Sequence, residues 1–152
     1  MPSASVRPDV RAFFEQFEQA ANGLDTAVLA ELFGDQFLSL DPARAACVPK
    51  DAFLRALPAR ERLFGSIGAA GTTLTEIRES PLDELHTLVE TSWAVQFGPD
   101  APAAGAGLTL RSAFLLRRQD GRWQVAVYLN HQDIAAVIGS LAQGAPGNGR
   151  PS

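Results

Sequence analysis

The feature that most constrains the fold is a pair of extended runs towards the C-terminal end of the chain, joined by a short turn. Residues 108–118 and 122–131 are rich in β-branched, aromatic and aliphatic side chains, and the turn between them is Gln119-Asp120-Gly121. Two such runs around a turn that ends in Asp-Gly form a strong local signal for a β-hairpin. The sequence therefore predicts an antiparallel pair of strands here.

The two faces of the second of these strands differ in character. Successive side chains of a strand point to opposite faces, so residues 122–131 divide into two sets. The first set is largely apolar and predicts a core face; it consists of Trp123, Val125, Val127, Leu129 and His131. The second set mixes small and hydrogen-bonding groups, as a pocket wall does; it consists of Gln124, Ala126, Tyr128 and Asn130.

Length and composition indicate one globular domain. A chain of 152 residues that is 46% hydrophobic and 20% charged fits neither a disordered nor a fibrous class. The net charge of −4 argues against nucleic acid as a partner, and no apolar run reaches the roughly 20 residues that span a membrane. The single Cys47 excludes an internal disulfide and favours the cytoplasm. Two histidines and one cysteine are too few for a zinc site, so neither a metal nor a cofactor is expected.

The N-terminal part of the chain has the periodicity of helices. Apolar residues at three- and four-residue spacing predict a first helix from Pro8 to Asn22, with its phenylalanines on one stripe. Asp25 is a suitable N-cap for a second helix, which Gly34 would end. A third helix is predicted over residues 49–64, with either a kink or a division into two short helices at Pro58, because proline lacks the N–H that an interior position needs.

The rest of the chain has the features of strands and loops. A short strand-like run at 37–40 leads directly into Asp41-Pro42. Two long strands are predicted at 72–79 and 84–97, and the Ala-, Gly- and Pro-rich segment 98–107 predicts a flexible connection. After the hairpin we expect one helical turn at 134–138. One domain would then span residues 1–138, followed by a flexible C-terminal tail at 139–152.

This order of elements predicts an α+β fold. Three N-terminal helices would pack into a strongly curved antiparallel sheet, because long strands covered by few helices curl around them. A curled sheet with helices in its mouth leaves a concave cavity, which is where small ligands bind.

Several local sequences add a resemblance to this pattern. They are Asn22-Gly-Leu-Asp25, Glu31-Leu-Phe33, Phe37-Leu-Ser-Leu-Asp-Pro42 and Gly121-Arg-Trp-Gln-Val125. Together with the order of elements, they resemble the nuclear transport factor 2-like (NTF2-like) superfamily over roughly residues 6–134. The resemblance implies a cone-shaped, cystatin-like α+β roll, like that of ketosteroid isomerase and the SnoaL-type polyketide cyclases.

The resemblance can be carried to individual residues of ketosteroid isomerase. The general base of that family is an aspartate followed by proline, and Asp41-Pro42 matches it. Its two oxyanion donors are a tyrosine and a protonated aspartic acid, and these positions correspond here to Phe17 and Ser112. A base without its oxyanion donors lacks what is usually the largest catalytic term, which argues against this particular activity.

Each candidate site residue has a functional and a structural interpretation. Asp41 is either a general base or the cap of a turn before Pro42, and His131 is either a second proton carrier or a strand-end residue bonded to the backbone. The remaining candidates would either contact a flat hydrophobic ligand and orient its oxygen, or serve the core, the outer face or a dimer contact. They are Phe17, Trp93, Ser112, Tyr128 and Asn130.

Two functions follow from these alternatives. The first is a SnoaL-like enzyme that isomerises, cyclises or dehydrates a small hydrophobic molecule by proton transfer, without a cofactor. Asp41 would be its base, and general base catalysis contributes about 10²- to 10⁴-fold. The second is a non-catalytic ligand-binding or dimerisation module. In both cases we expect a homodimer formed through the outer face of the sheet.

Overall fold

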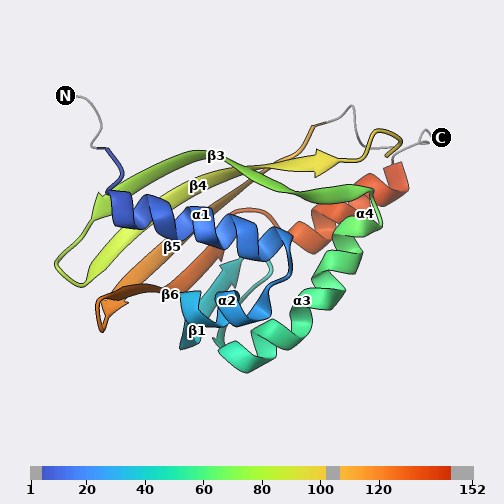
Figure 1. The fold of residues 1–152 in the computed structure, drawn as a ribbon. Helices are drawn as coiled ribbons and strands as arrows, with labels where there is room; N and C mark the ends of the chain where they lie inside the picture. Colours follow the sequence, from blue (N-terminus) through green and yellow to red (C-terminus); the bar gives the residue numbers. More distant parts are fainter. Residues whose placement is uncertain (1–4, 102–106, 145–152) are drawn as a thin grey trace.

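A curved six-stranded sheet with helices packed against it carries the fold of the computed structural model, which describes residues 5–101 and 107–144 (Figure 1). The helices are α1 (Pro8–Asn22), α2 (Thr26–Leu32), α3 (Lys50–Gly65) and α4 (Ile134–Gly144). The strands are β1 (Phe33–Asp41), β2 (Arg44–Pro49), β3 (Ala69–Pro81), β4 (His86–Phe97), β5 (Thr109–Gln119) and β6 (Arg122–Asn130).

The sheet is mixed rather than fully antiparallel. Its strand order is β2-β1-β6-β5-β4-β3, and β1 pairs with β6 in parallel, whereas the other neighbouring pairs are antiparallel. The predicted hairpin at 108–131 is confirmed as β5 and β6. The prediction of an entirely antiparallel sheet was wrong for one pair, because β1 enters the sheet beside the last strand of the chain.

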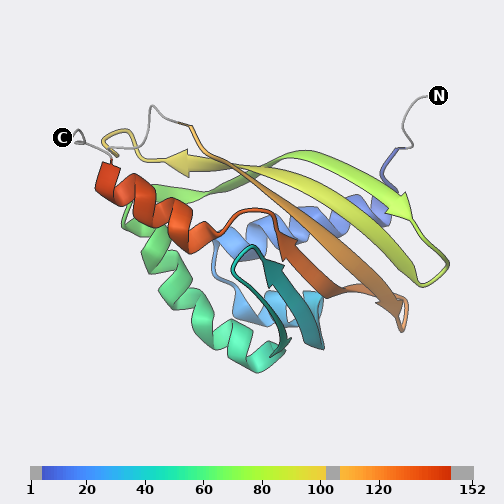
Figure 2. The ribbon, with the colours of Figure 1, turned by 180° about the vertical axis from the view of Figure 1, so that it is seen from behind.

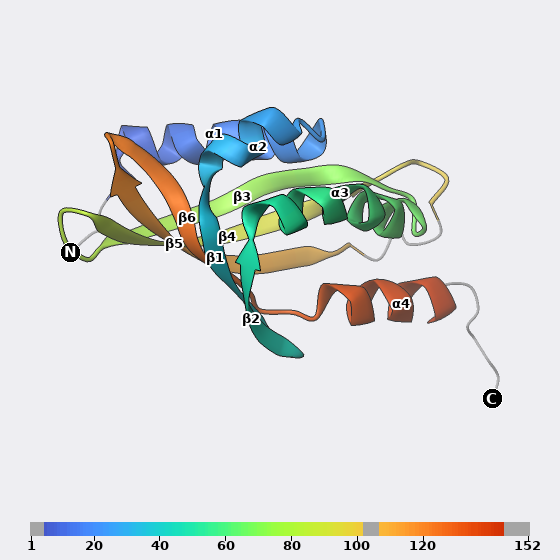
Figure 3. The same ribbon diagram turned by 90° about the horizontal axis from the view of Figure 1, so that it is seen from below.

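The helices are arranged in two groups. Seen from below, α1 and α2 form a layer on one side of the sheet (Figure 3). Figure 2 shows the molecule from behind, with the opposite face of β5 and β6 turned to the viewer. Helices α3 and α4 lie together at one end, away from the β3–β4 and β5–β6 turns (Figure 1). Helix α3 runs through Pro58, so the expected division into two helices is not found.

Aromatic side chains from both layers form the core. The predicted apolar stripe of α1 is confirmed: its buried residues are Val10, Phe13, Phe14, Phe17 and Ala20. Phe14 meets Phe114 of β5 edge to face at 5.0 Å between ring centroids. Phe33 is fully buried where α2 passes into β1, and its ring lies 4.6 Å from that of Phe53 on α3. Such aromatic pairs stabilise the packing of the helices on the sheet in addition to the stabilisation from the apolar area that they bury.

A β-bulge in β6 reverses the alternation of its side chains. Leu115 pairs with Val127 and Leu116 with Val125, so Ala126 is an extra residue without a partner on β5. Trp123 and Val125 are buried before the bulge, and after it Tyr128 is buried. The prediction that residues 123–131 alternate regularly was therefore wrong. The inner face consists of Trp123, Val125, Tyr128 and Asn130, whereas Val127, Leu129 and His131 lie on the outer side.

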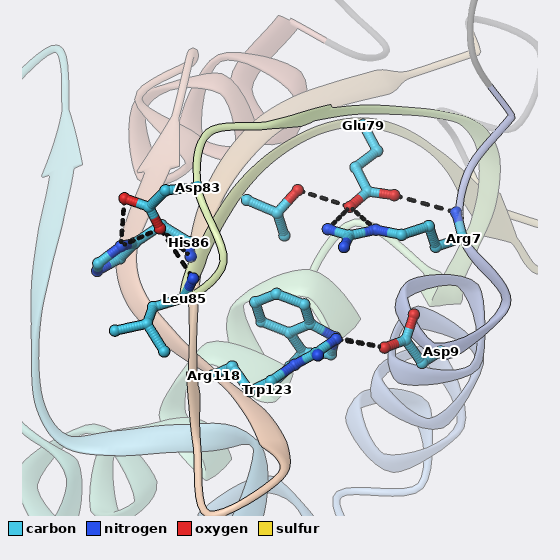
Figure 4. Close-up of polar contacts among 9 residues, drawn as sticks. Arg7, Asp9, Glu79, Asp83, Leu85, His86, Arg118 and Trp123 are labelled. Atoms are coloured by element: carbon cyan, nitrogen blue, oxygen red, sulfur yellow. Dashed lines mark hydrogen bonds and ion pairs between the residues drawn. The ribbon is translucent and has the colours of Figure 1, made fainter.

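A polar cluster ties the N-terminus to the end of the sheet opposite α3 (Figure 4). The Glu79 side chain on β3 is only 1% exposed. Its carboxylate accepts hydrogen bonds from the main-chain N–H, Nε and Nη2 of Arg7, at 3.0, 2.9 and 2.5 Å, and from Thr87 Oγ1 at 2.6 Å. Asp9 beside it accepts from Arg118 Nη2 at 2.7 Å and from Trp123 Nε1 at 3.0 Å. These bonds anchor α1 where it begins.

Candidate functional site

A cavity of about 180 Å³ lies between α1, α3 and the inner face of β4–β6. Most of its wall is apolar: the apolar side chains come from α1, α2 and the connection between them, from α3, from the sheet and from the start of α4. They are Phe17, Ala21, Leu24, Leu29, Phe53, Leu57, Phe64, Ala69, Ala70, Trp93, Leu110 and Ile134. The polar lining residues are Asn22, Arg60, Glu61, Thr72, Ser112, Tyr128 and Asn130.

Five of the residues singled out in the sequence lie together in this wall. Phe17 of α1 faces Trp93 of β4 with 5.8 Å between ring centroids. The others come from the last two strands and are Ser112, Tyr128 and Asn130. The bulge at Ala126 brings Tyr128 and Asn130 to the inner face. Their contact with a ligand remains a prediction.

A chain of hydrogen bonds runs across the sheet behind the cavity wall. Trp93 Nε1 donates to Thr91 Oγ1 at 2.8 Å, and Thr91 Oγ1 donates to the main-chain oxygen of Ser112 at 3.2 Å. Ser112 Oγ in turn donates to Asn130 Oδ1 at 3.0 Å. Thr91 and Ser112 are each 3% exposed. Buried polar groups are costly unless they are paired, and this chain satisfies them.

Two polar groups of the wall keep free hydrogen-bonding capacity. Tyr128 is 7% exposed and stacks on Phe114 with 4.8 Å between centroids, and its hydroxyl has no hydrogen-bond partner among residues 5–101 and 107–144. Within the same residues, the side-chain nitrogen of Asn130 has none either. A buried donor without a partner costs about 1–3 kcal/mol, so a bound polar atom would recover this cost at the Tyr128 hydroxyl. Asn130 is half-buried.

The sequence did not single out the charged residues of the cavity. Arg60 and Glu61 line it from α3, and the Arg60 guanidinium lies over the Phe64 ring at 5.7 Å from its centroid. The signal was present in the spacing: both residues fall three or four positions from Leu57 and Phe64, on the apolar face of the helix. Thr91 was missed because its role depends on cross-strand partners.

The structure does not bring Asp41 or His131 into this cavity. The half-buried Asp41 ends β1, and its Oδ1 accepts from the main-chain N–H groups of Ala43 and Arg44 at 2.8 and 3.0 Å. This is the turn-capping alternative: the carboxylate accepts the hydrogen bonds that these two N–H groups of the β1–β2 turn would otherwise make to water. His131 is exposed on the other side of the bulged strand, so the two residues do not form an acid–base pair at the cavity wall.

Comparisons with solved structures agree on the architecture. An NTF2-like protein of unknown function from Shewanella oneidensis MR-1 is 17% identical, with a TM-score of 0.64 over 82% of this chain and 97% of that chain. The chain has the NTF2-like fold. A cystatin-like protein of unknown function from Nostoc punctiforme is 12% identical, with a TM-score of 0.65 over 88% and 96% of the two chains. An NTF2-like protein with a cystatin-like fold from Novosphingobium aromaticivorans is 13% identical, with a TM-score of 0.64 over 86% of each chain.

The NTF2-like fold confirms the α+β class and the resemblance noted in the sequence. No protein-family model and no curated protein matches the sequence. At identities of 12–17% the likeness concerns the fold alone. None of the helices in the described part of the chain is long and apolar enough to cross a lipid bilayer.

Proposed function

We propose that this NTF2-like chain binds one small, largely apolar molecule in the cavity between α1, α3 and the sheet. The observation that carries the proposal is the environment of α3. None of its 16 residues is buried, although Phe53, Leu57 and Phe64 lie on one face and line the cavity. These side chains pack against the core on one side, but they stay only half-buried because the cavity leaves part of this apolar face uncovered. An apolar face that borders a cavity supports a ligand as its partner.

The volume of the cavity indicates the size of the molecule that it can enclose. An apolar cavity of about 150 Å³ holds a benzene molecule, and this one measures about 180 Å³. A single ring with a short substituent is therefore the ligand class that we propose. The polar lining groups would orient one oxygen of that ligand.

Among the two functions inferred from the sequence, ligand binding without catalysis is the one that we favour. Proton transfer needs a base within hydrogen-bond reach of the substrate. Among the described residues, Glu61 is the only carboxylate that lines the cavity, and it is exposed. The positions of Asp41 and His131 do not support the isomerase, cyclase or dehydratase reading.

Acetophenone, a one-ring ketone that quenches tryptophan fluorescence, tests the proposal. We expect saturable quenching in the Trp123→Phe variant, which retains Trp93 in the cavity wall. The Trp93→Phe variant retains Trp123, which is bonded to Asp9 at the other end of the sheet, and should show only weak, linear quenching. Equal saturable quenching of both variants would contradict a ligand site at this cavity.

Asp41→Ala separates a structural carboxylate from a functional one. We expect the variant to lose about 1 kcal/mol of unfolding free energy, because two hydrogen bonds of the β1–β2 turn are lost. Its affinity for acetophenone should stay within about twofold of the wild type, since binding does not use this carboxylate. Urea unfolding and the fluorescence titration measure the two effects. A much weaker affinity in a folded variant would show that ligand binding depends on the Asp41 carboxylate.

We also propose that the protein is a homodimer formed through the outer face of the sheet. An apolar row crosses four strands there, because Leu38, Val127, Leu115 and Leu88 are successive register partners. Leu38 is 38% exposed and the others are half-buried. A twofold axis through this row would bring the same apolar residues of the two copies together.

Sedimentation tests the dimer. The wild type should sediment as a particle of twice the 16.2 kDa chain mass, and Leu115→Glu should shift it to a monomer, because a carboxylate would be buried without a partner. Leu85→Glu is the matched control: it makes the same change at a 45%-exposed leucine in the β3–β4 turn, outside the row. A dimer unaffected by Leu115→Glu would place the interface elsewhere.

The exposed thiol of Cys47 supports the cytoplasm as the proposed compartment. This is the chain's single cysteine, and its Sγ contacts Gln36 Oε1 at 3.5 Å. An exposed thiol persists most readily where the surroundings are reducing.

A further inference from the structure

We propose that Ser112 fixes the orientation of the Asn130 amide, so that the cavity offers hydrogen-bond donors and selects ligands with an acceptor oxygen. The ligand class is an aromatic carbonyl compound: a ketone, an aldehyde or an ester. This inference rests on the proposed binding function and adds the polarity of the bound group.

The first step is the direction of the bond between Ser112 and Asn130. A serine hydroxyl has a single hydrogen to donate. Among the residues that the structure describes, the acceptor for Ser112 Oγ is Asn130 Oδ1, at 3.0 Å. In this arrangement the amide oxygen of Asn130 faces Ser112, which leaves the amide nitrogen, a donor of two hydrogens, for the cavity that this residue lines.

The second step concerns Tyr128, two residues earlier on the same face of β6. It is 93% inaccessible to solvent and lines the cavity, and its ring is held between Phe114 and Phe33 at 4.8 and 6.2 Å. Two ring contacts fix the plane of the phenol. Its hydroxyl makes no hydrogen bond with the described residues, so it adds a second donor to the wall that Asn130 also lines.

The third step is the state of the other polar groups in the inner wall. The indole N–H of Trp93 is already donated to Thr91, so it is not available to a ligand. Asn22 pairs with the backbone of Thr72 in both directions, at 2.8 and 2.9 Å. No carboxylate of the described residues lines the sheet side of the cavity, since Glu61 belongs to α3. On this wall an amine would find only hydroxyl oxygens as acceptors, since the one carboxylate of the cavity lies across from it on α3.

Matched ligands and variants test the polarity. Acetophenone carries a carbonyl, whereas cumene has nearly the same shape without a polar atom. We expect Asn130→Leu to weaken acetophenone binding about 3- to 10-fold, the range of one hydrogen bond, and to leave cumene within twofold. Tyr128→Phe removes a single oxygen and should act in the same direction. It provides the test if Asn130→Leu does not fold.

The role of Ser112 has its own readout. In Ser112→Ala the amide of Asn130 can turn and present its oxygen, so the preference for acetophenone over 1-phenylethylamine should fall at least threefold, without a comparable change for cumene. Ser112→Thr keeps the hydroxyl and should restore the preference. The infrared carbonyl band of bound acetophenone should lie at lower frequency in the wild type and shift upward in the Asn130→Leu variant, because donated hydrogen bonds weaken the C=O bond.

The outcomes separate this inference from the proposed function. If both acetophenone and cumene bind and neither variant changes their ratio, the polarity inference is overturned while the apolar site stands. Preferential binding of the amine by the wild type would also overturn it. If neither ligand binds to the wild-type protein, both proposals fail.

Discussion

Arg7→Met is expected to lower the free energy of unfolding by about 3 kcal/mol at neutral pH, the lower end of the range for breaking a buried ion pair. The variant keeps the main-chain N–H of residue 7 but removes both guanidinium hydrogen bonds to Glu79. The Glu79 side chain is 1% exposed, so its charge would stay away from water with little compensation. The lower end applies because the Arg7 side chain itself is 39% exposed. Urea unfolding followed by circular dichroism measures the loss.

The chain offers a matched control for this substitution. Arg78 pairs with Glu90 at 2.5 Å on the next stretch of β3 and β4, but these side chains are 71% and 45% exposed. Exposed ion pairs contribute little, so Arg78→Met should change stability by less than about 1 kcal/mol. Equal losses in the two variants would show that burial of Glu79 does not determine the effect.

The stability that this pair contributes should depend on pH. Burial raises the pKa of Glu79, but the hydrogen bonds from Arg7 and Thr87 outweigh it, so the pKa lies below its ordinary value of 4.5. A carboxyl whose pKa is lowered by folding contributes its full stabilisation above the unfolded-state pKa and loses it as the pH falls through the folded-state pKa. The difference between the wild type and Arg7→Met should therefore be largest at pH 7 and shrink below about pH 4.5. A difference that is constant with pH would contradict this account.

Phe17→Ala is expected to cost about 3–5 kcal/mol, the range for truncating a buried phenylalanine, and to enlarge the ligand cavity. Phe17 is 8% exposed and lines the cavity beside Trp93. Because the new space joins the existing cavity, a two-ring ketone such as 2-acetonaphthone should bind the variant and not the wild type. Saturating ligand stabilises a folded protein by about 2.7 kcal/mol at 100 times its Kd. The ketone should therefore restore part of the stability that the variant loses. The melting temperature with and without the ketone measures this recovery.

Phe14→Ala is the control, because Phe14 lies on the same stripe of α1 and is fully buried but does not line the cavity. We expect a comparable loss of stability without recovery by 2-acetonaphthone. Recovery of both variants to the same extent would mean that the ketone binds any space in the core. If the ketone restores the stability of neither variant, Phe17 does not line the ligand site.

The parts of the fold that were predictable from the sequence are those with a strong local signal. The Asp-Gly turn fixed the β5–β6 hairpin, and the phenylalanine stripe fixed the buried face of α1. Strand β2 was missed because Ala45, Ala46 and Pro49 have low strand propensity, and it forms by pairing with β1. The parallel pairing of β1 with β6 was also missed, because a pairing between residues far apart in the chain has no local signature.

Five residues of the cavity wall were singled out from the sequence, but their arrangement in space was not predictable. Regular alternation along β6 would separate Tyr128 and Asn130 from the core residue Val125, and only the pairing with β5 shows that Ala126 is the extra residue. For Asp41, the sequence left a base and a turn cap as alternatives. The choice depends on the N–H groups of Ala43 and Arg44, which a turn brings to the carboxylate.

The extra residue at Ala126 has a consequence for how this chain can diverge. It divides β6 into a half that carries Trp123, whose indole is bonded to Asp9 at the start of α1, and a half that carries Tyr128 and Asn130 in the cavity wall. Under the binding function proposed above, an exchange at Asn130 would change the chemical selectivity of the cavity. The pairing of Trp123 and Val125 with β5 would be inherited unchanged.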